Sequence, residues 1–224
     1  MIIRMMLHTG TDTKKALLDA GEKLLVERGI TGLTVRAVTE AANANLGAVT
    51  YHFGSKERLV EEIFLRRLRP VHQASIARLD ALEASLVGRE PKLDEIIEIL
   101  VRSIIEARGV EDNEMSALKL TQRGIQDLPL ETRTVVEEES AEFIRRFDSA
   151  ILRSVPELPP EELYWRQKFF MGALSFGVDA WTSFGQSPYP HSDVQPKELD
   201  SEALIVRLVA FICAGITARL PDRS

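Results

Sequence analysis

Apolar residues near the start of the chain recur at the spacing of one helix face. Five positions follow the pattern i, i+3, i+4, i+7 and i+8, which is typical of a helix that buries one side. They are Leu17, Ala20, Gly21, Leu24 and Leu25. The pattern predicts a helix over residues 12–28, with Asp12 as its N-cap and Gly29 as the residue that ends it.

Two further helices are predicted directly after the first, joined by a tight turn. Thr34 can cap a short helix over residues 35–42. Its inward positions are Val35, Val38 and Ala42. A break follows at Asn43, because asparagine tolerates the left-handed backbone conformation that such a turn requires. Asn45 is the expected cap of a third helix that runs to Phe53.

A fourth helix is predicted to begin immediately after the third. Gly54 ends the third helix, and Ser55 caps a helix that runs towards Leu79. Pro70 lies inside this helix and is expected to kink it. Its apolar stripe consists of Leu59, Ile63, Phe64, Leu68 and Val71.

The third helix has an unusual mixture of side chains, in the stretch "NLGAVTYHFGSKERL" over residues 45–59. Gly47 and Ala48 keep its beginning thin, so that its backbone can sit deep in a DNA major groove. Val49 and Phe53 are expected to point back into the core. Three short helices with this turn predict a helix-turn-helix.

Polar groups at the ends of these helices are placed to bind the DNA backbone. Tyr51, His52 and Lys56 offer hydroxyl, imidazole and ammonium groups for phosphates. A lysine near a helix start is unfavourable for the helix dipole, which favours a phosphate role for Lys56. Thr34 and the free N–H groups that open its helix form a second phosphate clamp. The alternatives are core packing for Tyr51 and a plain surface position for His52.

The rest of the chain is also predicted to be helical, with no repeat and no strand-like alternation. Expected helices cover residues 93–108, 114–128, 129–155, 161–184 and 201–220. The inward side chains of two of them are Ile96, Ile97, Leu100, Ile104, Ile105, Phe143, Ile144 and Phe147. The proline-rich stretch "GQSPYPHSDVQPKE" predicts a loop before the last helix.

Composition fits a soluble globular protein, with 45% hydrophobic and 28% charged residues. The formal net charge is −6, but it is unevenly distributed. Residues 1–70 carry +3, from 11 Lys and Arg against 8 Asp and Glu, whereas residues 71–224 carry −9. An acidic body with a mildly basic N-terminal module suits a protein that presents one end to DNA. Chance variation along the chain is the alternative.

The expected location is the cytoplasm. A single cysteine, Cys213, excludes an intramolecular disulfide framework and fits a reducing compartment. The start "MIIRMMLHTG" lacks the long apolar region and cleavage site of a signal peptide. The most apolar window, residues 203–218, is short for a membrane span and contains Arg207, so no membrane partner is expected.

The run "TVRAVTEAANANLGAVTYHFGSKERL" resembles the DNA-binding domain of the TetR family of transcriptional regulators. The turn, the Tyr51-His52-Phe53 triplet and Ser55-Lys56 all fall at that family's spacing, over about residues 12–70. The resemblance implies that these residues contact bases or the groove floor: Arg36, Asn45, Leu46, Gly47, Ala48 and Thr50. It implies that these hold the backbone: Thr34, Tyr51, His52 and Lys56.

Two positions depart from the family pattern. Asn43 stands where the family often has glycine, which bears on turn geometry. Leu46 offers only apolar contact, such as to a thymine methyl group. Base specificity is therefore expected to depend on few hydrogen bonds, with Arg36 as the best single candidate and a solvated helix charge as its alternative.

The last two helices are predicted to form a dimer interface. Small and aromatic residues recur at helical spacing on both, and in TetR-like proteins such a pair meets its twofold mate as a four-helix bundle. The expected interface residues are Phe169, Ala173, Phe176, Gly177, Ala180, Phe184, Leu204, Leu208, Ile212, Gly215 and Ile216. A homodimer would place two recognition helices about 34 Å apart, in successive major grooves of a palindromic operator. The alternative is that both helices are monomer core.

The resemblance also implies a small-molecule effector held among the C-terminal helices. The expected ligand-binding residues are Leu100, Ile104, Leu118, Gln122, Phe143, Phe147, Phe170 and Trp181, each of which could instead be ordinary core. Arg102 and Asp179 are further candidates for a polar anchor. The stretch "LPPEELYWRQKFFMGALSFGVDAW" resembles the C-terminal domain of a TetR branch that includes fatty-acid-responsive regulators, which suggests a lipophilic effector.

Enzymatic chemistry finds no support in the sequence. The four histidines form no metal-ligand cluster, and the chain has neither a G-x-S-x-G elbow nor a phosphate loop. Glu137, Glu138 and Glu139 fan around a helix and are expected to be solvated, so neither a metal nor a cofactor is expected. The alternative function is a helical dimer that acts through protein partners without specific DNA binding.

The resulting prediction is an all-α, ligand-responsive regulator with two domains. Residues 10–56 are expected to form the helix-turn-helix domain, the helix over about 55–79 connects, and residues 57–224 form the effector-binding and dimerisation domain. Resemblance to the family favours a repressor over an activator.

Overall fold

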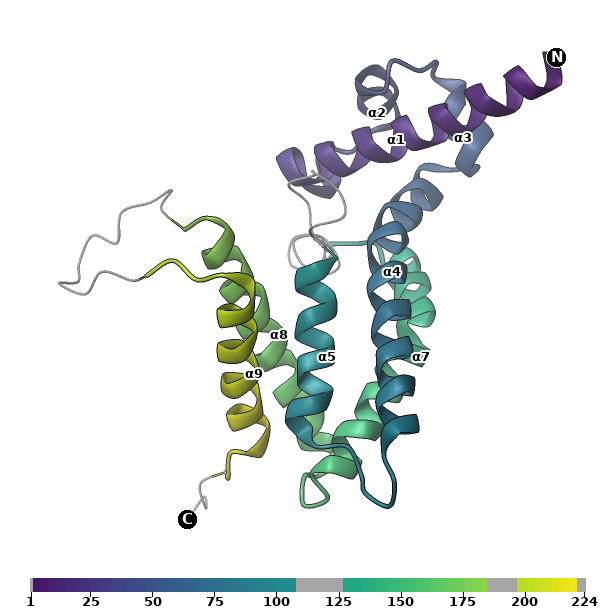
Figure 1. The fold of residues 1–224 in the computed structure, drawn as a ribbon. Helices are drawn as coiled ribbons and strands as arrows, with labels where there is room; N and C mark the ends of the chain where they lie inside the picture. The colour runs from purple at the N-terminus through teal and green to yellow at the C-terminus, as the bar shows by residue number, and fades with distance from the viewer. Residues whose placement is uncertain (1, 108–126, 185–196, 221–224) are drawn as a thin grey trace. The chain divides into compact units, whose positions relative to one another are not determined.

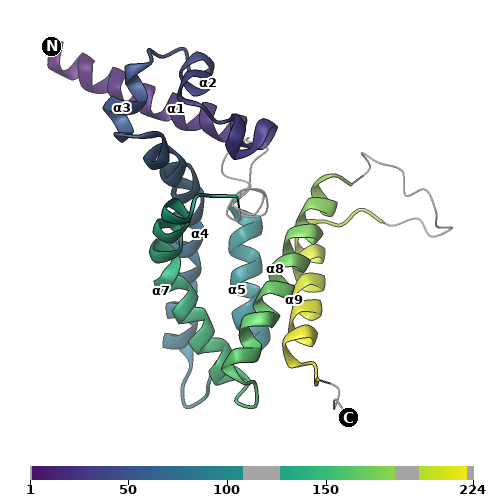
Figure 2. The same cartoon turned by 180° about the vertical axis from the view of Figure 1, so that it is seen from behind.

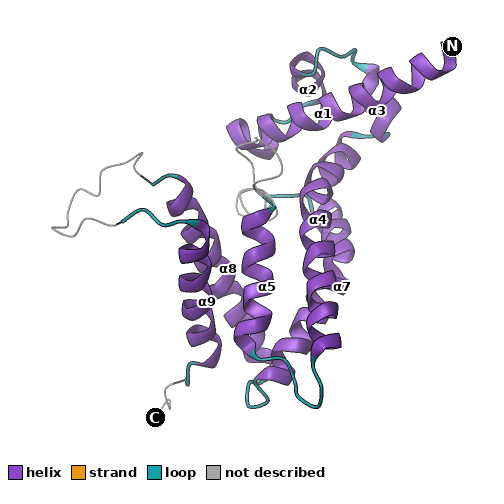
Figure 3. Cartoon of the chain, viewed as in Figure 1, coloured by secondary structure: helices purple, strands orange, loops and turns teal. Residues whose placement is uncertain are grey.

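The structure is a computed structural model that describes residues 2–107, 127–184 and 197–220. Within those ranges it consists of helices and loops, without a strand, and so confirms the predicted all-α class (Figures 1 and 3). The helices are α1 Ile2–Gly32, α2 Val35–Ala41, α3 Gly47–Phe53, α4 Lys56–Ser85, α5 Leu93–Glu106, α7 Leu130–Ser154, α8 Pro160–Thr182 and α9 Ser201–Thr217. None of these helices is long and apolar enough to cross a membrane.

Contacts between residues divide the chain into two units. The first falls within Met1–Pro70 and Asn113–Ala141, and the second within Val71–Asp112 and Glu142–Ser224. Helices α4 and α7 each supply residues to both units.

The core of the first unit is the stripe that the sequence predicts. Leu17, Leu24 and Leu25 of α1 are buried against Leu59 and Ile63 of α4 in one apolar cluster, which also includes residues of α2, α3 and α7. Helices α1 and α4 approach closely at Gly21, because a Cβ atom there would lie 2.5 Å from the Cδ1 atom of Ile63.

An ion pair also fastens α1 to α4. The Nη2 atom of Arg67 donates to Glu22 at 2.6 Å, and its Nε atom donates to the other carboxylate oxygen at 3.1 Å. Glu22 is buried, so the bidentate contact compensates a charge that water does not reach.

The helix ends agree with the sequence in part. Helix α1 is interrupted at Gly29, whose φ of 67° is non-helical, where the sequence predicts its end. Its start at Ile2 lies ten residues before the predicted cap Asp12. The prediction that Asn45 caps α3 through its side chain is wrong, because the N-cap is Leu46, without a side-chain hydrogen bond.

Helix α4 continues beyond the predicted end at Leu79 and finishes at Ser85. It runs through Pro70, which is exposed, so the ring lies on the solvent side. Ser55 caps its start as predicted, because its Oγ atom accepts from the N–H of Arg58 at 3.2 Å.

The second unit packs the later parts of α4 and α7 side by side, with α5 between α4 and α9 (Figures 1 and 2). Arg146 of α7 binds Asp80 and Glu83 of α4. Arg102 of α5 binds Glu202 of α9 at 2.6 Å. Charged contacts therefore join α7 to α4 and α5 to α9.

The apolar face of α5 is buried as predicted, with Ile96, Ile97 and Leu100 in the core. On α7, Phe147 is buried and Phe143 is half-buried, but the inward position predicted for Ile144 is wrong. Ile144 is exposed because its position, one residue after Phe143, turns it about 100° away around the helix.

Candidate nucleic-acid interface

Helices α2 and α3 are joined by the turn that the sequence predicts. Thr34 caps α2, because its Oγ1 atom accepts from the N–H of Ala37 at 3.1 Å. Asn43 has a φ of 51°, in the left-handed region, and the N–H of Ala44 donates to the carbonyl of Thr39 at 2.8 Å. Gly54 ends α3 with a φ of 82°, a conformation that a side chain would strain.

The predicted DNA-contacting residues lie mostly on the surface of α2 and α3. Leu46 is 66% exposed and Tyr51 is 84% exposed. Also exposed are Thr34, Arg36, Asn45, Gly47 and Thr50, while His52 and Lys56 are half-buried. Leu46 at the N-cap of α3 and Tyr51 within the helix thus present an apolar and a polar-aromatic side chain to solvent.

Ala48 is the predicted contact that the structure places elsewhere. It is buried with Val49 in the apolar cluster of the first unit. Its methyl group therefore packs in the core and does not line the exposed surface.

Aromatic and cationic groups gather at the end of α3. The rings of Tyr51 and His52 meet edge to face, with centroids 4.9 Å apart. The Nζ atom of Lys14 lies 5.5 Å from the ring centroid of Phe53. Sequence reasoning missed Lys14, because α1 precedes α3 by many residues and no periodicity relates its polar positions to the recognition helix.

Arg36 is held by a neighbour on its own helix. Its Nε atom lies 2.8 Å from the Oε1 atom of Glu40, one turn later on α2, and both side chains are largely exposed. This hydrogen bond raises the pKa of the guanidinium, and an arginine is charged at physiological pH even without such a partner.

Among the predicted effector contacts, the structure brings two aromatic residues of α7 together. Phe143 and Phe147 have ring centroids 4.9 Å apart, and His72 of α4 stacks on Phe143 at 4.2 Å. Trp181 uses its indole N–H within the chain, in a 2.7 Å hydrogen bond to the carbonyl of Leu199. Leu100 is buried and Ile104 and Phe170 are half-buried, whereas Leu118 and Gln122 lie outside the described residues.

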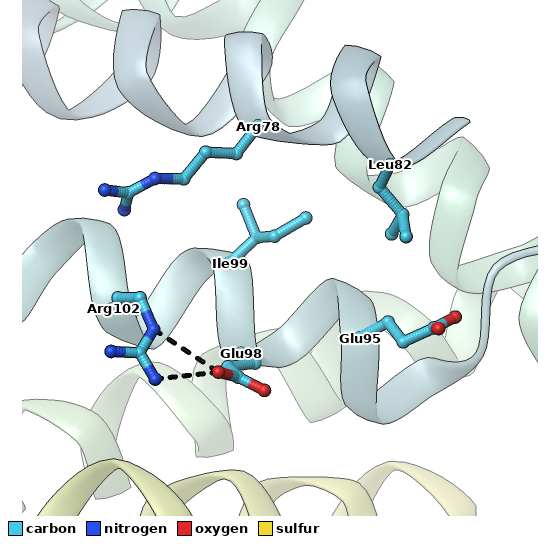
Figure 4. Close-up of a pocket in the computed structure, with 6 residues that line it drawn as sticks. All are labelled: Arg78, Leu82, Glu95, Glu98, Ile99 and Arg102. Atoms are coloured by element: carbon cyan, nitrogen blue, oxygen red, sulfur yellow. Dashed lines mark hydrogen bonds and ion pairs between the residues drawn. The ribbon is translucent and has the colours of Figure 1, made fainter. Parts of the chain in front are cut away.

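A pocket of about 290 Å³ lies between α4 and α5 (Figure 4). It is lined by Arg78, Leu82, Glu95, Glu98, Ile99 and Arg102. Among these residues, the sequence predicts only Arg102 as a polar anchor for an effector.

The charged groups of this pocket are already paired. Arg102 binds Glu98 at 2.8 Å as well as Glu202, and Arg78 donates to Ser103 at 2.9 Å and binds Glu106. The hydrogen bond from Arg89 lowers the pKa of Glu95 to about 2. The charged side chains that line the pocket therefore already have partners of opposite charge within the chain.

Comparison with known families matches both halves of the chain. The C-terminal pattern described as "Tetracyclin repressor-like, C-terminal domain" matches residues 98–215, more than half of the sequence. The N-terminal pattern described as "Bacterial regulatory proteins, tetR family" matches residues 17–63, which include α2 and α3. The chain belongs to the TetR family.

TetR-family proteins are helix-turn-helix transcriptional regulators and not enzymes. The protein is 45% identical over 47 residues to the transcriptional repressor KstR2 of Rhodococcus jostii, covering 21% of this chain and 23% of KstR2. It is 33% identical over 82 residues to the repressor NemR of Escherichia coli, covering 37% of this chain and 41% of NemR. The matches thus span less than half of these relatives.

The whole fold is similar to solved TetR-type structures. The fatty acid degradation regulator FadR of Bacillus halodurans superimposes with a TM-score of 0.63 at 15% identity, covering 92% of this chain and 97% of FadR. At this identity the likeness shows a shared fold.

Helix α8 of this TetR-family chain carries a row of exposed aromatic residues. Phe176 is 78% exposed, Phe169 and Ala180 are also exposed, and so is Phe184, which follows the end of the helix. Ala173 is half-buried.

On α9, most of the residues predicted for the dimer interface lie on the face that packs inside the chain. Leu204, Leu208, Ile212 and Ile216 are buried within the chain, against α5 and α8. Gly177 belongs to this internal contact, because a Cβ atom there would lie 2.9 Å from the Cδ2 atom of Leu208.

The exposed face of α9 includes Val206, Phe211 and Gly215, with Phe211 at 67% exposure. Sequence reasoning missed Val206 and Phe211, as well as exposed Trp165 on α8. The available signal was that apolar residues occupy more of α9 than one face, with Arg207 as the charged residue in its middle, which indicates that more than one side is covered.

Proposed function

We propose that this protein is a dimeric repressor that binds a palindromic operator and is released by a small lipophilic effector. The observation that carries the proposal is the exposure of Arg36 on α2 and of Leu46 and Tyr51 at α3. In this proposal residues 10–56 act as the DNA-binding domain, and residues 57–224 act as the effector and dimerisation domain.

The proposed contacts divide into base readers and backbone binders. Base readers face the major groove from the start of α3 and from α2: Arg36, Asn45, Leu46, Gly47 and Thr50. Backbone binders surround them: Thr34, Tyr51, His52 and Lys56, to which we add Lys14 because its ammonium lies beside Phe53 at the end of α3. Such a division lets phosphates fix the register while few side chains carry sequence information.

The proposed dimer uses the exposed faces of α8 and α9. Phe169, Phe176 and Ala180 from α8 join Val206 and Phe211 from α9. Aromatic residues of this size rarely stay in water on a monomer surface, and a second copy supplies a complementary twofold-related face. Leu204, Leu208, Ile212 and Ile216, which are buried within the chain, take no part in it.

The proposed effector is lipophilic because the residues available to hold it are apolar. The candidates that lie within the described residues all fall in the second unit: Leu100, Ile104, Phe143, Phe147, Phe170 and Trp181. FadR of Bacillus halodurans is a regulator of fatty acid degradation, and its fold is shared by this chain. An effector needs to supply only the coupling typical of allostery, about 1–3 kcal/mol, to release the operator.

The experiment that tests the proposal is selection of bound duplexes from random DNA by the purified protein at near-physiological salt. Enrichment of a two-fold symmetric site supports both DNA reading and the dimer. Weak, salt-sensitive binding without enrichment contradicts the proposal and favours action through protein partners or a requirement for the ligand. The enriched duplex then serves as the probe for release by acyl compounds.

A further inference from the structure

Arg36 and Glu40 form a pair whose geometry suits more than helix stabilisation. Glu40 accepts from the Nε atom of Arg36 at 2.8 Å, and it is the partner that the described residues supply to this guanidinium. The contact occupies the side of the guanidinium and leaves the two terminal amino groups available. Those two groups are the ones that make paired hydrogen bonds to the O6 and N7 atoms of guanine.

The pair contributes little to folding. The side chains are 80% and 65% exposed, and exposed ion pairs one turn apart on a helix stabilise it only slightly. The order is also the less favourable one, since the basic residue precedes the acidic residue along the helix. Stabilisation of α2 is therefore a weak reason for this contact.

A carboxylate on this surface also works against DNA binding in general. Glu40 is the acidic residue of α2, and it lies on the helix that Thr34 and Arg36 place against the DNA in the proposed function. Phosphates repel it on every sequence. An unpaired Arg36, in contrast, has a long flexible side chain that any nearby phosphate attracts.

We propose that Glu40 is a positioning residue that sets the sequence discrimination of Arg36. It holds the guanidinium by the Nε atom, so that the terminal amino groups point at a base edge, and its charge reduces the attraction of Arg36 to phosphates. Glu40 therefore lowers affinity for random DNA while it raises the ratio of operator to random binding. The proposal rests on the proposed function of α2 and α3 in DNA reading.

The test compares Glu40→Gln with Glu40→Ala on three duplexes. These are the selected operator, the same operator with the base pair read by Arg36 exchanged, and random DNA. Arg36→Ala identifies that base pair as the one whose preference it relaxes. Glutamine keeps an oxygen that accepts from the Nε atom but loses the charge, whereas alanine loses both.

Both variants are expected to bind random DNA several-fold more tightly than the wild type, because one negative charge is removed. Glu40→Gln should keep the preference for the operator over its exchanged form. Glu40→Ala should lose about tenfold of that preference, a part of what a paired arginine–guanine contact supplies.

The matched control is Glu27 on α1. It forms an exposed pair with Lys23 at 3.8 Å, with the same spacing and the same order of charges. Glu27→Gln and Glu27→Ala should leave the preference between the two operators unchanged.

Equal effects of Glu40→Ala on both operators and on random DNA would overturn the positioning role and leave Glu40 as a charge alone. A loss of preference in the Glu27 variants would also overturn it. If the wild type selects no operator, the proposed function fails first and the inference fails with it, so the two failures are distinguishable. Circular dichroism of each variant confirms that α2 is retained.

Discussion

In the proposed function, Arg36 of α2 reads the DNA sequence, whereas Lys56 at the start of α4 adds affinity for any sequence. Arg36 and Lys56 lie on different helices, and only Arg36 is held by a carboxylate one turn away. A side chain that reads a base changes discrimination when it is removed, whereas one that binds a phosphate changes all affinities together. These two residues therefore give different expected signatures.

Arg36→Ala should weaken operator binding by about 1–3 kcal/mol and relax the preference at one base pair in each half-site. Removal of the guanidinium leaves the base edge without its hydrogen-bond partner. The measurement is the dissociation constant on the operator and on single-base variants. Equal losses on operator and random DNA would contradict a role in reading bases.

Lys56→Ala should weaken binding to all sequences alike. The slope of log affinity against log salt should fall by roughly one for each subunit, because one phosphate contact and its released counterion are lost. Titrations at several salt concentrations measure this slope. Glu57→Ala, at the neighbouring exposed position, is the comparison, and a change in base preference for Lys56→Ala would be inconsistent with a backbone role.

At the scale of elements, local signals in the sequence specify α2, its turn and the caps around α3. Thr34, Asn43 and Gly54 each have the backbone conformation that their residue types predict. Sequence reasoning was less successful with Ala48, because an alanine at the boundary of a stripe fits the core and the surface equally well. Helix α9 shows the same limitation at larger scale.

The sequence of a largely apolar helix such as α9 does not reveal which of its sides packs against the rest of the same chain. The spacing of Leu204, Leu208 and Ile212 correctly places them on one face of α9. That face was predicted to form the dimer interface, but it packs on α5 and α8 of the same chain. The missing information was the close approach at Gly177, a tertiary contact that no periodicity encodes. The pairing of Arg102 with Glu202 is likewise a contact over 100 residues that sequence alone does not predict.

The cap of α2 gives a prediction at this scale. Thr34→Ala should lower the free energy of unfolding by about 1 kcal/mol, because the N–H of Ala37 loses its acceptor. Thr34→Ser keeps the hydroxyl and should remain close to the wild type in both stability and operator binding. Urea unfolding measures the first and gel-shift titration the second. Equal stability of the alanine and serine variants would show that the cap contributes nothing.

The contact between His72 of α4 and Phe143 of α7 makes the second unit sensitive to acid. Burial lowers the pKa of His72 to about 4, from a usual value of 6.5. As pH falls from about 6.5 to 4, the unfolded chain binds a proton that the folded chain does not, so stability falls across that window.

His72→Phe should preserve the stacking and reduce that loss of stability between pH 6.5 and pH 4. The measurement is the urea midpoint as a function of pH for both proteins. Identical pH profiles would mean that His72 is protonated in the folded state, contrary to its burial.

At the scale of the molecule, the exposed aromatic residues of α8 and α9 form the surface that we propose for dimerisation. Phe176→Glu and Phe211→Glu should each shift the protein towards monomers in sedimentation experiments, because a charge is placed in an apolar contact. Operator affinity should fall in parallel, since each half-site then binds independently. Val87→Glu, on an exposed loop between α4 and α5, is the control and should remain dimeric. Wild-type sedimentation of both phenylalanine variants would place the interface elsewhere.

The exposed Phe176 and Phe211 have a further consequence if two protomers share them. The fraction of dimer then depends on protein concentration, and the midpoint temperature of thermal unfolding rises with that concentration. Dilution dissociates the dimer and exposes the aromatic rings to water. The resulting monomer is less stable and more prone to aggregate. The number of copies in a cell would therefore set how long each copy survives as well as how fully its operator is occupied.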